Sequence, residues 1–189
     1  MALSSSSIPI LGLLTWRPMA GYELRQKIQE SIGNFWSESY GQIYPQLRLL
    51  NEAGLITKVL NEQSKRENKN VYAITDTGRE ALSEWISNTP VNRPPRNELL
   101  LKVFFASEGD QGVVLDHCRK AREDAVERLR KYRSIEKQLK TIRNHQGRLK
   151  YWQMTLRMGI SEAQNFISWC DETLSEFQKA DTHDEDSEK

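Results

Sequence analysis

Polar side chains able to hydrogen-bond the edges of nucleic-acid bases gather at the start of one expected helix, which ends at Gly54. Ile43, Leu47 and Leu50 recur at helical spacing and are expected to face a core. Glutamine carries the donor and acceptor that fit adenine N6 and N7, and hydroxyls can donate to bases or phosphates. The pattern is typical of a recognition helix. The side chains left around its exposed start are Ser39, Tyr40, Gln42, Tyr44 and Gln46.

A group of cations lies between two short runs that have the composition of β-strands. Residues 55–60 and 71–75 are apolar and β-branched, and the stretch between them is polar. Lys65, Arg66 and Lys69 lie in this polar stretch, which is suited to follow a phosphate backbone. Helix, strand, basic loop and strand in this order predict a winged helix.

Four aromatic residues of the same region are assigned either to a DNA contact or to core packing. Tyr22 follows Gly21 at the expected start of an earlier helix, where helix N-termini meet phosphates. The ring of Tyr44 can pack under its helix while the hydroxyl reaches a phosphate, and pure core packing is an equally good interpretation. Phe35 and Trp36 are expected to be core residues at a corner between helices.

The elements that position these residues are expected within residues 1–90, as one winged-helix domain. Helices are predicted at residues 8–15 and 22–31, before the recognition helix. A further helix is expected after the wing, with Thr77 and Glu80 as a capping box. Its inner face is assigned to Leu82, Trp85 and Ile86. Three prolines between residues 90 and 95 end the domain and make residues 91–96 a linker.

Residues 97–178 are expected to form a helical dimerisation domain. The run 98–106 is so continuously apolar that it should be buried between elements, and two long antiparallel helices follow. A helix over residues 148–177 would be roughly 45 Å long, at ~1.5 Å per residue, and a second copy of the chain is expected to cover it. The dimer seam is assigned to Leu149, Trp152, Leu156, Ile160, Ile167 and Leu174.

Composition narrows the class of protein. The chain has 189 residues, 38% of them hydrophobic, and a net charge of +1, which argues against a nonspecific nucleic-acid binder. Residues 179–189 read as an acidic, disordered tail. Cys118 and Cys170 lie far apart without metal-site spacing, and no signal peptide or membrane span is expected. A mainly α protein with a small β wing, located in the cytoplasm, is therefore predicted.

A small-molecule effector is expected, but its binding residues are left unassigned. Trp152, Met154 and Met158 could line a pocket against Trp16 or Phe104, although dimer core is the favoured interpretation. Cations for an anionic group would come from Arg143, Arg148 or Arg157.

Catalysis, metal binding and a cofactor are not expected. The three histidines lie apart, and no nucleophile, base and oxyanion device are grouped in the sequence.

Six ordered motifs together resemble the PadR family of bacterial transcriptional regulators, in its longer form with a helical C-terminal domain. The resemblance implies a homodimer on a palindromic DNA operator, released when a small aromatic effector binds, as in repressors of phenolic acid stress genes. Tyr40 and Gly41 depart from those repressors, so their operator sequence is not carried over. The motifs are residues 10–14, 21–24, 35–37 leading to 42–47, 50–56, 72–78 and 98–105.

Three alternatives to a repressor remain open at this point. A transcriptional activator of the same fold would share every feature above. A winged helix that docks protein instead of DNA, or a helical protein that sequesters a ligand, would leave the polar helix start and the basic wing unexplained.

Overall fold

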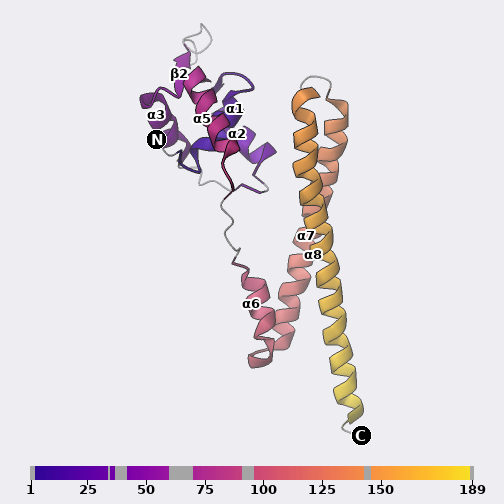
Figure 1. Cartoon of the computed structure of the whole chain (residues 1–189). Coiled ribbons are helices and arrows are strands. Elements are labelled where there is room, and N and C mark those ends of the chain that lie inside the picture. Colours follow the sequence, from indigo (N-terminus) through magenta and orange to yellow (C-terminus); the bar gives the residue numbers. More distant parts are fainter. Residues whose placement is uncertain are drawn as a thin grey trace. The chain divides into compact units, whose positions relative to one another are not determined.

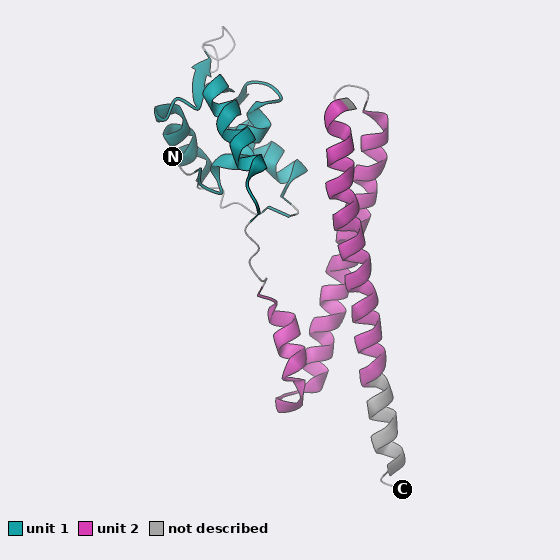
Figure 2. Cartoon of the chain, in the orientation of Figure 1, with its two compact units in different colours: residues 1–92 teal, residues 93–189 magenta. Residues whose placement is uncertain are grey.

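The computed structural model describes residues 3–33, 35–36, 42–59, 70–90, 96–142 and 146–187, without the side chains of residue 146 and of residues from 178 onward. The chain divides into two compact units, residues 1–92 and 93–189 (Figure 2). The division falls inside the linker predicted at residues 91–96, of which 91–95 lie outside the described residues.

The first unit is a winged helix, as predicted. Its sheet is antiparallel with strand order β1-β3-β2, so the two-stranded wing gains a third strand that the sequence analysis missed. The elements in chain order are α1 (Ser7–Leu14), β1 (Met19–Ala20), α2 (Gly21–Ser31), α3 (Ile43–Glu52), β2 (Ile56–Val59), β3 (Val71–Ile74) and α5 (Asp76–Ser87) (Figure 1).

The predicted inner face of α3 is buried in the core of this unit. Ile43, Leu47 and Leu50 are only 4%, 1% and 2% exposed and pack with Leu11 and Leu24 from α1 and α2. Burying a side chain of this size stabilises the fold by about 1.5–3 kcal/mol. The rotation of α3 is therefore fixed, and its opposite face is turned to solvent.

Glycine and threonine set the boundaries of α3 and α5. Gly54 adopts a φ of +70° directly after α3, a left-handed conformation that favours glycine. The side chain of Thr75 accepts a hydrogen bond from the Gly78 N–H at 3.0 Å and donates to the Gly54 carbonyl at 2.7 Å. The capping box predicted for Thr77 and Glu80 is therefore wrong, because Thr75 is the N-cap.

Three residues of this unit that were predicted to be in the core are exposed. Trp85 and Ile86 of α5 are 44% and 67% exposed, because Ala81 and Leu82 make the contact with the core. Phe35 is 61% exposed, which also corrects its assignment as a core residue.

The second unit is a helical hairpin with a short helix before it. It contains α6 (Glu98–Phe104), a 3-10 turn (Ala106–Glu108), α7 (Gln111–Thr141) and α8 (Gln146–Ser187). The two long helices lie side by side and antiparallel, as predicted (Figure 1). None of the helices in the described part of the chain combines the length and apolarity needed to cross a membrane.

Helix α8 is longer than the sequence analysis expected. It was predicted to end near residue 177, before a disordered tail, and its backbone continues to Ser187. Residues 178–187 contain no glycine or proline that would stop a helix.

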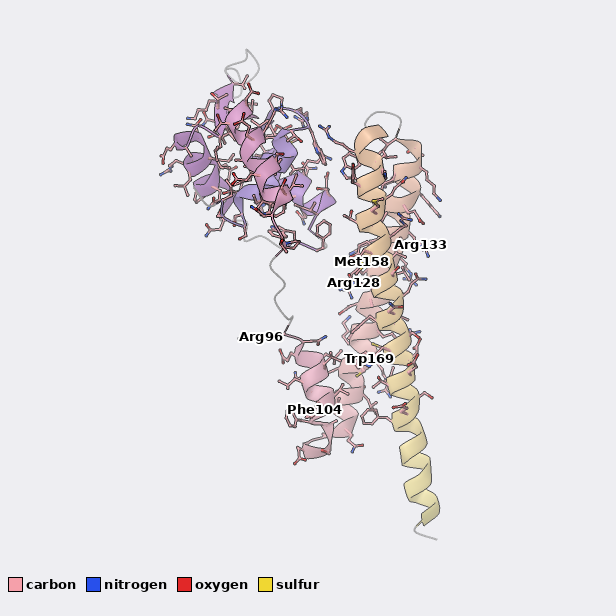
Figure 3. All side chains as sticks on the ribbon, in the orientation of Figure 1. Arg96, Phe104, Arg128, Arg133, Met158 and Trp169 are labelled. Atoms are coloured by element: carbon pink, nitrogen blue, oxygen red, sulfur yellow. The ribbon has the colours of Figure 1, made fainter. Side chains whose placement is uncertain are left out.

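The surface of α6 differs most from expectation. The run 98–106 was predicted to be buried, yet no residue of α6 is buried within the chain. Leu101 is 59% exposed and Phe104 is 78% exposed. Figure 3 labels Phe104 on this helix. The prediction is wrong for the single chain, because α6 packs on α7 through only part of its apolar surface.

Candidate nucleic-acid interface

The start of α3 presents polar side chains to solvent. Gln42 directly precedes the helix, with φ −86° and ψ −17°, and its exposed side chain makes no capping hydrogen bond. Tyr44 is 62% exposed. Pro45 lies in the first turn, where its missing N–H costs no helical hydrogen bond. Ser39 and Tyr40, predicted to share this surface, lie outside the described residues.

Tyr44 lies against the first residue of α2. A Cβ atom added to Gly21 would be 2.6 Å from Cε1 of Tyr44 and 3.2 Å from Cδ1 of Leu47. Glycine is therefore the residue that leaves room for the ring at this position. Tyr44 packs along one edge and stays mostly exposed, so core packing alone does not describe it.

The N-terminus of α2 is held in place beside this tyrosine. Glu23 accepts the Ala20 N–H at 2.8 Å through one carboxylate oxygen and the Arg17 guanidinium at 2.7 Å through the other. Tyr22, the second residue of α2, is 47% exposed. Backbone N–H groups at a helix start carry partial positive charge. Tyr44 packs against Gly21 at the start of α2, and Tyr22 lies in the first turn of that helix, so both phenol groups lie near this helix start.

Gln46 does not belong to the exposed surface on which the sequence analysis placed it. It is half-buried, and its Oε1 accepts hydrogen bonds from Ser4 at 2.9 Å and Ser7 at 2.8 Å. These serines lie ahead of and at the start of α1, about forty residues earlier in the chain. Helix periodicity predicted both Gln42 and Gln46 to be exposed. It could not predict the hydrogen bonds of Gln46, because their donors Ser4 and Ser7 are distant in sequence.

The described part of the wing contributes one cation, Lys58 on β2. Strands β2 and β3 pair from Ile56 with Ile74 to Val59 with Val71, and Lys58 on β2 is exposed. The three predicted wing cations, Lys65, Arg66 and Lys69, lie outside the described residues.

Two cations were missed by the sequence analysis. Arg48 is exposed on α3 one turn after Tyr44, and Lys58 is exposed on β2. The four-residue spacing between Tyr44 and Arg48 was a signal for a shared helix face. Lys58 carried no such signal, because alternation along a four-residue strand is too short to assign a face.

The predicted dimer seam divides between two environments. Ile160 is 5% exposed and packs with Tyr132 and Leu156 inside the α7–α8 hairpin. Leu149, Trp152, Ile167 and Leu174 are half-buried on α8. Ile160 therefore supports the chain's own hairpin, and the dimer role of the set stays a prediction.

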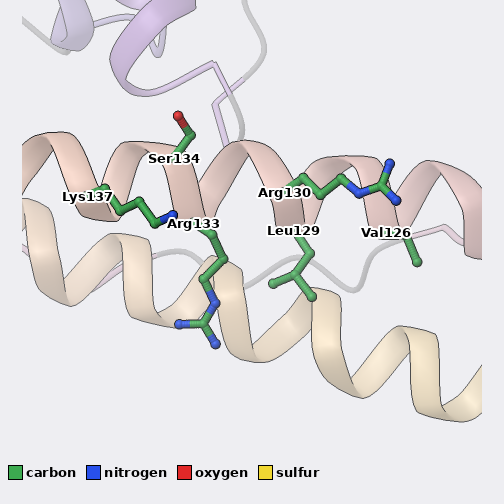
Figure 4. Close-up of a pocket in the computed structure, with 6 residues that line it drawn as sticks. All are labelled: Val126, Leu129, Arg130, Arg133, Ser134 and Lys137. Carbon is green, nitrogen blue, oxygen red and sulfur yellow. The ribbon is translucent and has the colours of Figure 1, made fainter.

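Two of the described candidate effector residues of the second unit are exposed methionines. Met154 and Met158 are 43% and 60% exposed on α8, and Arg143 lies outside the described residues. A hollow of about 400 Å³ lies instead along α7 (Figure 4). Its lining combines cations with two apolar side chains, from Val126, Leu129, Arg130, Arg133, Ser134 and Lys137.

The two cysteines face the seam of the hairpin as free thiols. Cys118 and Cys170 are both fully buried. Burial raises the pKa of Cys118, and burial together with the neighbouring Cys118 raises the pKa of Cys170 to about 11. Thiols in this state are weak nucleophiles at neutral pH. Among the described residues, no three metal-binding side chains come together.

The fold and this surface define a winged-helix protein whose recognition helix has an exposed, polar start. Residues 10–84 match the transcriptional regulator PadR-like family, and residues 95–178 match the C-terminal domain described as virulence activator alpha. The chain belongs to the PadR-like family of transcriptional regulators.

Two relatives align with nearly the whole chain. A probable transcriptional regulator of Mycobacterium tuberculosis is 32% identical over 184 residues, which cover 90% of this chain and 96% of that protein. The negative transcriptional regulator PadR of Bacillus subtilis is 26% identical over 175 residues, with the same two coverages.

Solved structures share the fold over more than nine tenths of the chain. Bacillus subtilis PadR in complex with operator DNA has a TM-score of 0.80 at 24% identity, covering 93% of this chain and 99% of that one. The same protein with p-coumaric acid has a TM-score of 0.75 at 25% identity and the same coverages. The Vibrio cholerae virulence activator AphA has a TM-score of 0.74 at 28% identity, covering 94% and 99%.

Proposed function

We propose that this protein is a homodimeric, sequence-specific DNA-binding repressor of the cytoplasm, released from its operator by a small aromatic effector. The observation that carries the proposal is the exposed pair Gln42 and Tyr44 beside the start of α2. The relation to a negative transcriptional regulator over 90% of the chain supports the repressor role. An enzymatic role is not part of the proposal.

Base reading is assigned to the start of α3. The amide of Gln42 offers the donor and acceptor that pair with adenine N6 and N7 in the major groove. Ser39 and Tyr40, just before it in the sequence, are proposed to add further contacts to bases or phosphates. These residues would select the sequence, because only base edges differ between sites.

Phosphate contacts are assigned to the surrounding donors and cations. Tyr22 lies in the first turn of α2, and Tyr44 packs against Gly21 at the start of the same helix. Arg48 follows Tyr44 by one turn of α3. Lys58, with the wing cations Lys65, Arg66 and Lys69, would follow the backbone beyond the recognition helix. These contacts fix the register and give binding its salt dependence.

A second copy of the chain is proposed to cover the exposed apolar surface of the second unit. Leu101 and Phe104 of α6 are more than half exposed, a state that soluble monomers rarely leave uncovered over a contiguous patch. The predicted α8 residues Leu149, Trp152, Leu156, Ile167 and Leu174 would extend the seam. Two recognition helices about 34 Å apart would then read the half-sites of a palindrome.

The proposed effector is a small aromatic acid. A relative of this chain, Bacillus subtilis PadR, has been crystallised with p-coumaric acid. The hollow on α7 places Arg130, Arg133 and Lys137 beside apolar Val126 and Leu129, a combination that suits a carboxylate joined to an aromatic ring.

A transcriptional activator is the second candidate, because of the C-terminal domain. Residues 95–178 match the virulence activator domain, and AphA shares the fold at 28% identity. The DNA-binding surface would be the same, and only the position of the operator relative to the promoter would differ.

A mobility-shift assay on the DNA upstream of the protein's own coding sequence tests the proposal, with unlabelled nonspecific DNA as competitor. A shift that resists the competitor and disappears with p-coumaric or a related phenolic acid is expected. Transcription in vitro from the same fragment separates repression from activation. Absence of a competitor-resistant shift on this fragment and in a genome-wide binding selection would overturn the DNA-binding function.

A further inference from the structure

The N-terminal segment is attached to the recognition helix by a closed set of three polar side chains. Gln46 Oε1 accepts from the hydroxyl of Ser4 at 2.9 Å and from that of Ser7 at 2.8 Å, and the two hydroxyls are 2.7 Å apart. Ser7 is only 4% exposed, and its backbone N–H also donates to the Ser4 carbonyl at 3.0 Å. We call these contacts among Ser4, Ser7 and Gln46 the serine clasp.

The geometry of the serine clasp removes Gln46 from base reading. Adenine recognition uses the oxygen and the nitrogen of one amide together. A carbonyl oxygen has two lone pairs, and both hydroxyls of the clasp point at this one. Each hydroxyl has a single proton, so Ser4 and Ser7 share two protons among three short contacts, two with Gln46 Oε1 and one with each other.

The clasp lies one turn after the residue assigned to base reading. Gln46 follows Gln42 by four residues, and the side chain of Gln42, the N-cap residue, makes no capping hydrogen bond. Within the described residues, the first turn of α3 is held by the burial of Ile43 and Leu47, by the contact of Tyr44 with Gly21 and by the clasp. A net hydrogen bond contributes about 0.5–1.5 kcal/mol, which is enough to bias the orientation of a single helical turn.

We propose that Gln46 is a positioning residue, and that the serine clasp makes Ser4 and Ser7 part of the DNA-reading unit by fixing the direction of the α3 start. The proposal rests on the DNA-binding function proposed above. Loss of the clasp lets the first turn of α3 tilt, so Gln42 meets its base edge less often. Phosphate contacts, which tolerate small displacements, keep their strength.

The test compares Gln46→Leu, Ser7→Ala and the double variant with wild type. The probe is the duplex that the wild-type protein selects from a random library, and a scrambled duplex of equal length serves as the nonspecific reference. Ser5→Ala is the matched control, because Ser5 is exposed and lies outside the clasp. Circular dichroism at the assay temperature confirms that each variant is folded, and fluorescence anisotropy gives the affinities.

Each single variant is expected to bind the selected duplex about fivefold to tenfold more weakly, with unchanged affinity for the scrambled duplex and an unchanged salt slope. The double variant should be no weaker than the weaker single variant, because both changes break the same contact. Ser5→Ala should bind as wild type does.

Three results would overturn the proposal. If Gln46→Leu loses affinity while Ser7→Ala does not, Gln46 contacts DNA directly. If all variants bind the selected duplex as wild type does, the clasp serves folding alone. If the wild-type protein selects no duplex, the DNA-binding function fails and the clasp proposal fails with it.

Discussion

The contact between Gly21 and Tyr44 joins the start of α2 to the start of α3. A Cβ atom on Gly21 would lie 2.6 Å from the tyrosine ring, closer than side chains approach one another. The ring would have to move, and Leu47 at 3.2 Å limits where it can go. At the scale of residues, the lack of a side chain at Gly21 allows Tyr44 to pack against the start of α2.

Gly21→Ala is therefore expected to weaken specific DNA binding by about tenfold and to lower the free energy of unfolding by about 1–3 kcal/mol, the usual cost of overpacking. Gly12→Ala is the matched control, because no atom lies within 4 Å of its added Cβ and it should not destabilise α1. Urea denaturation and anisotropy measure the two effects. Equal behaviour of both variants would contradict the contact.

At the scale of elements, the sequence allowed the inner face of α3 and the α7–α8 hairpin to be predicted. The spacing of Ile43, Leu47 and Leu50 predicted the buried face of α3, because helix periodicity depends only on residues close together in the sequence. Exposure of Trp85 and Phe104 could not be predicted, because an apolar side chain in a helix gives no sign of which neighbour covers it. The inward turn of Gln46 depended on serines remote in sequence.

The N-cap of α5 gives a direct test of an element boundary. Thr75→Ala removes the acceptor for the Gly78 N–H and the donor to the Gly54 carbonyl. We expect a loss of about 1–2 kcal/mol in the free energy of unfolding. Thr77→Ala, the same change at an exposed position of α5, should cost less than about 0.5 kcal/mol. A larger loss from Thr77→Ala would restore the predicted capping box.

The α7–α8 seam should respond to alkaline pH through its thiols. The folded-state pKa of Cys170 is raised from 9.0 to about 11, so its stabilising effect is complete below pH 9 and is lost as pH rises to about 11. We expect the free energy of unfolding to fall by at most about 3 kcal/mol across this window. Urea denaturation of Cys170→Ala should show a smaller decline, and an equally steep one would refute this cause.

At the scale of the whole molecule, the uncovered apolar surface of α6 argues for assembly. Leu101→Glu with Phe104→Glu should raise the dimer dissociation constant by at least about a hundredfold, because each buried side chain of this kind is worth about 1.5–3 kcal/mol. Gln164→Glu is the control, since it adds charge at an exposed position of α8. Sedimentation equilibrium measures the constant, and an unchanged dimer would place the interface elsewhere.

Reading of base sequence by α3 is the central claim, and an equilibrium specificity ratio tests it most directly. Anisotropy titrations would compare a selected operator duplex with a scrambled duplex for wild type, Gln42→Ala and the control Gln164→Ala. We predict that Gln42→Ala loses about tenfold to a hundredfold in operator affinity and keeps its affinity for scrambled DNA, as expected for one bidentate base contact. Operator affinity equal to wild type in Gln42→Ala would contradict the account.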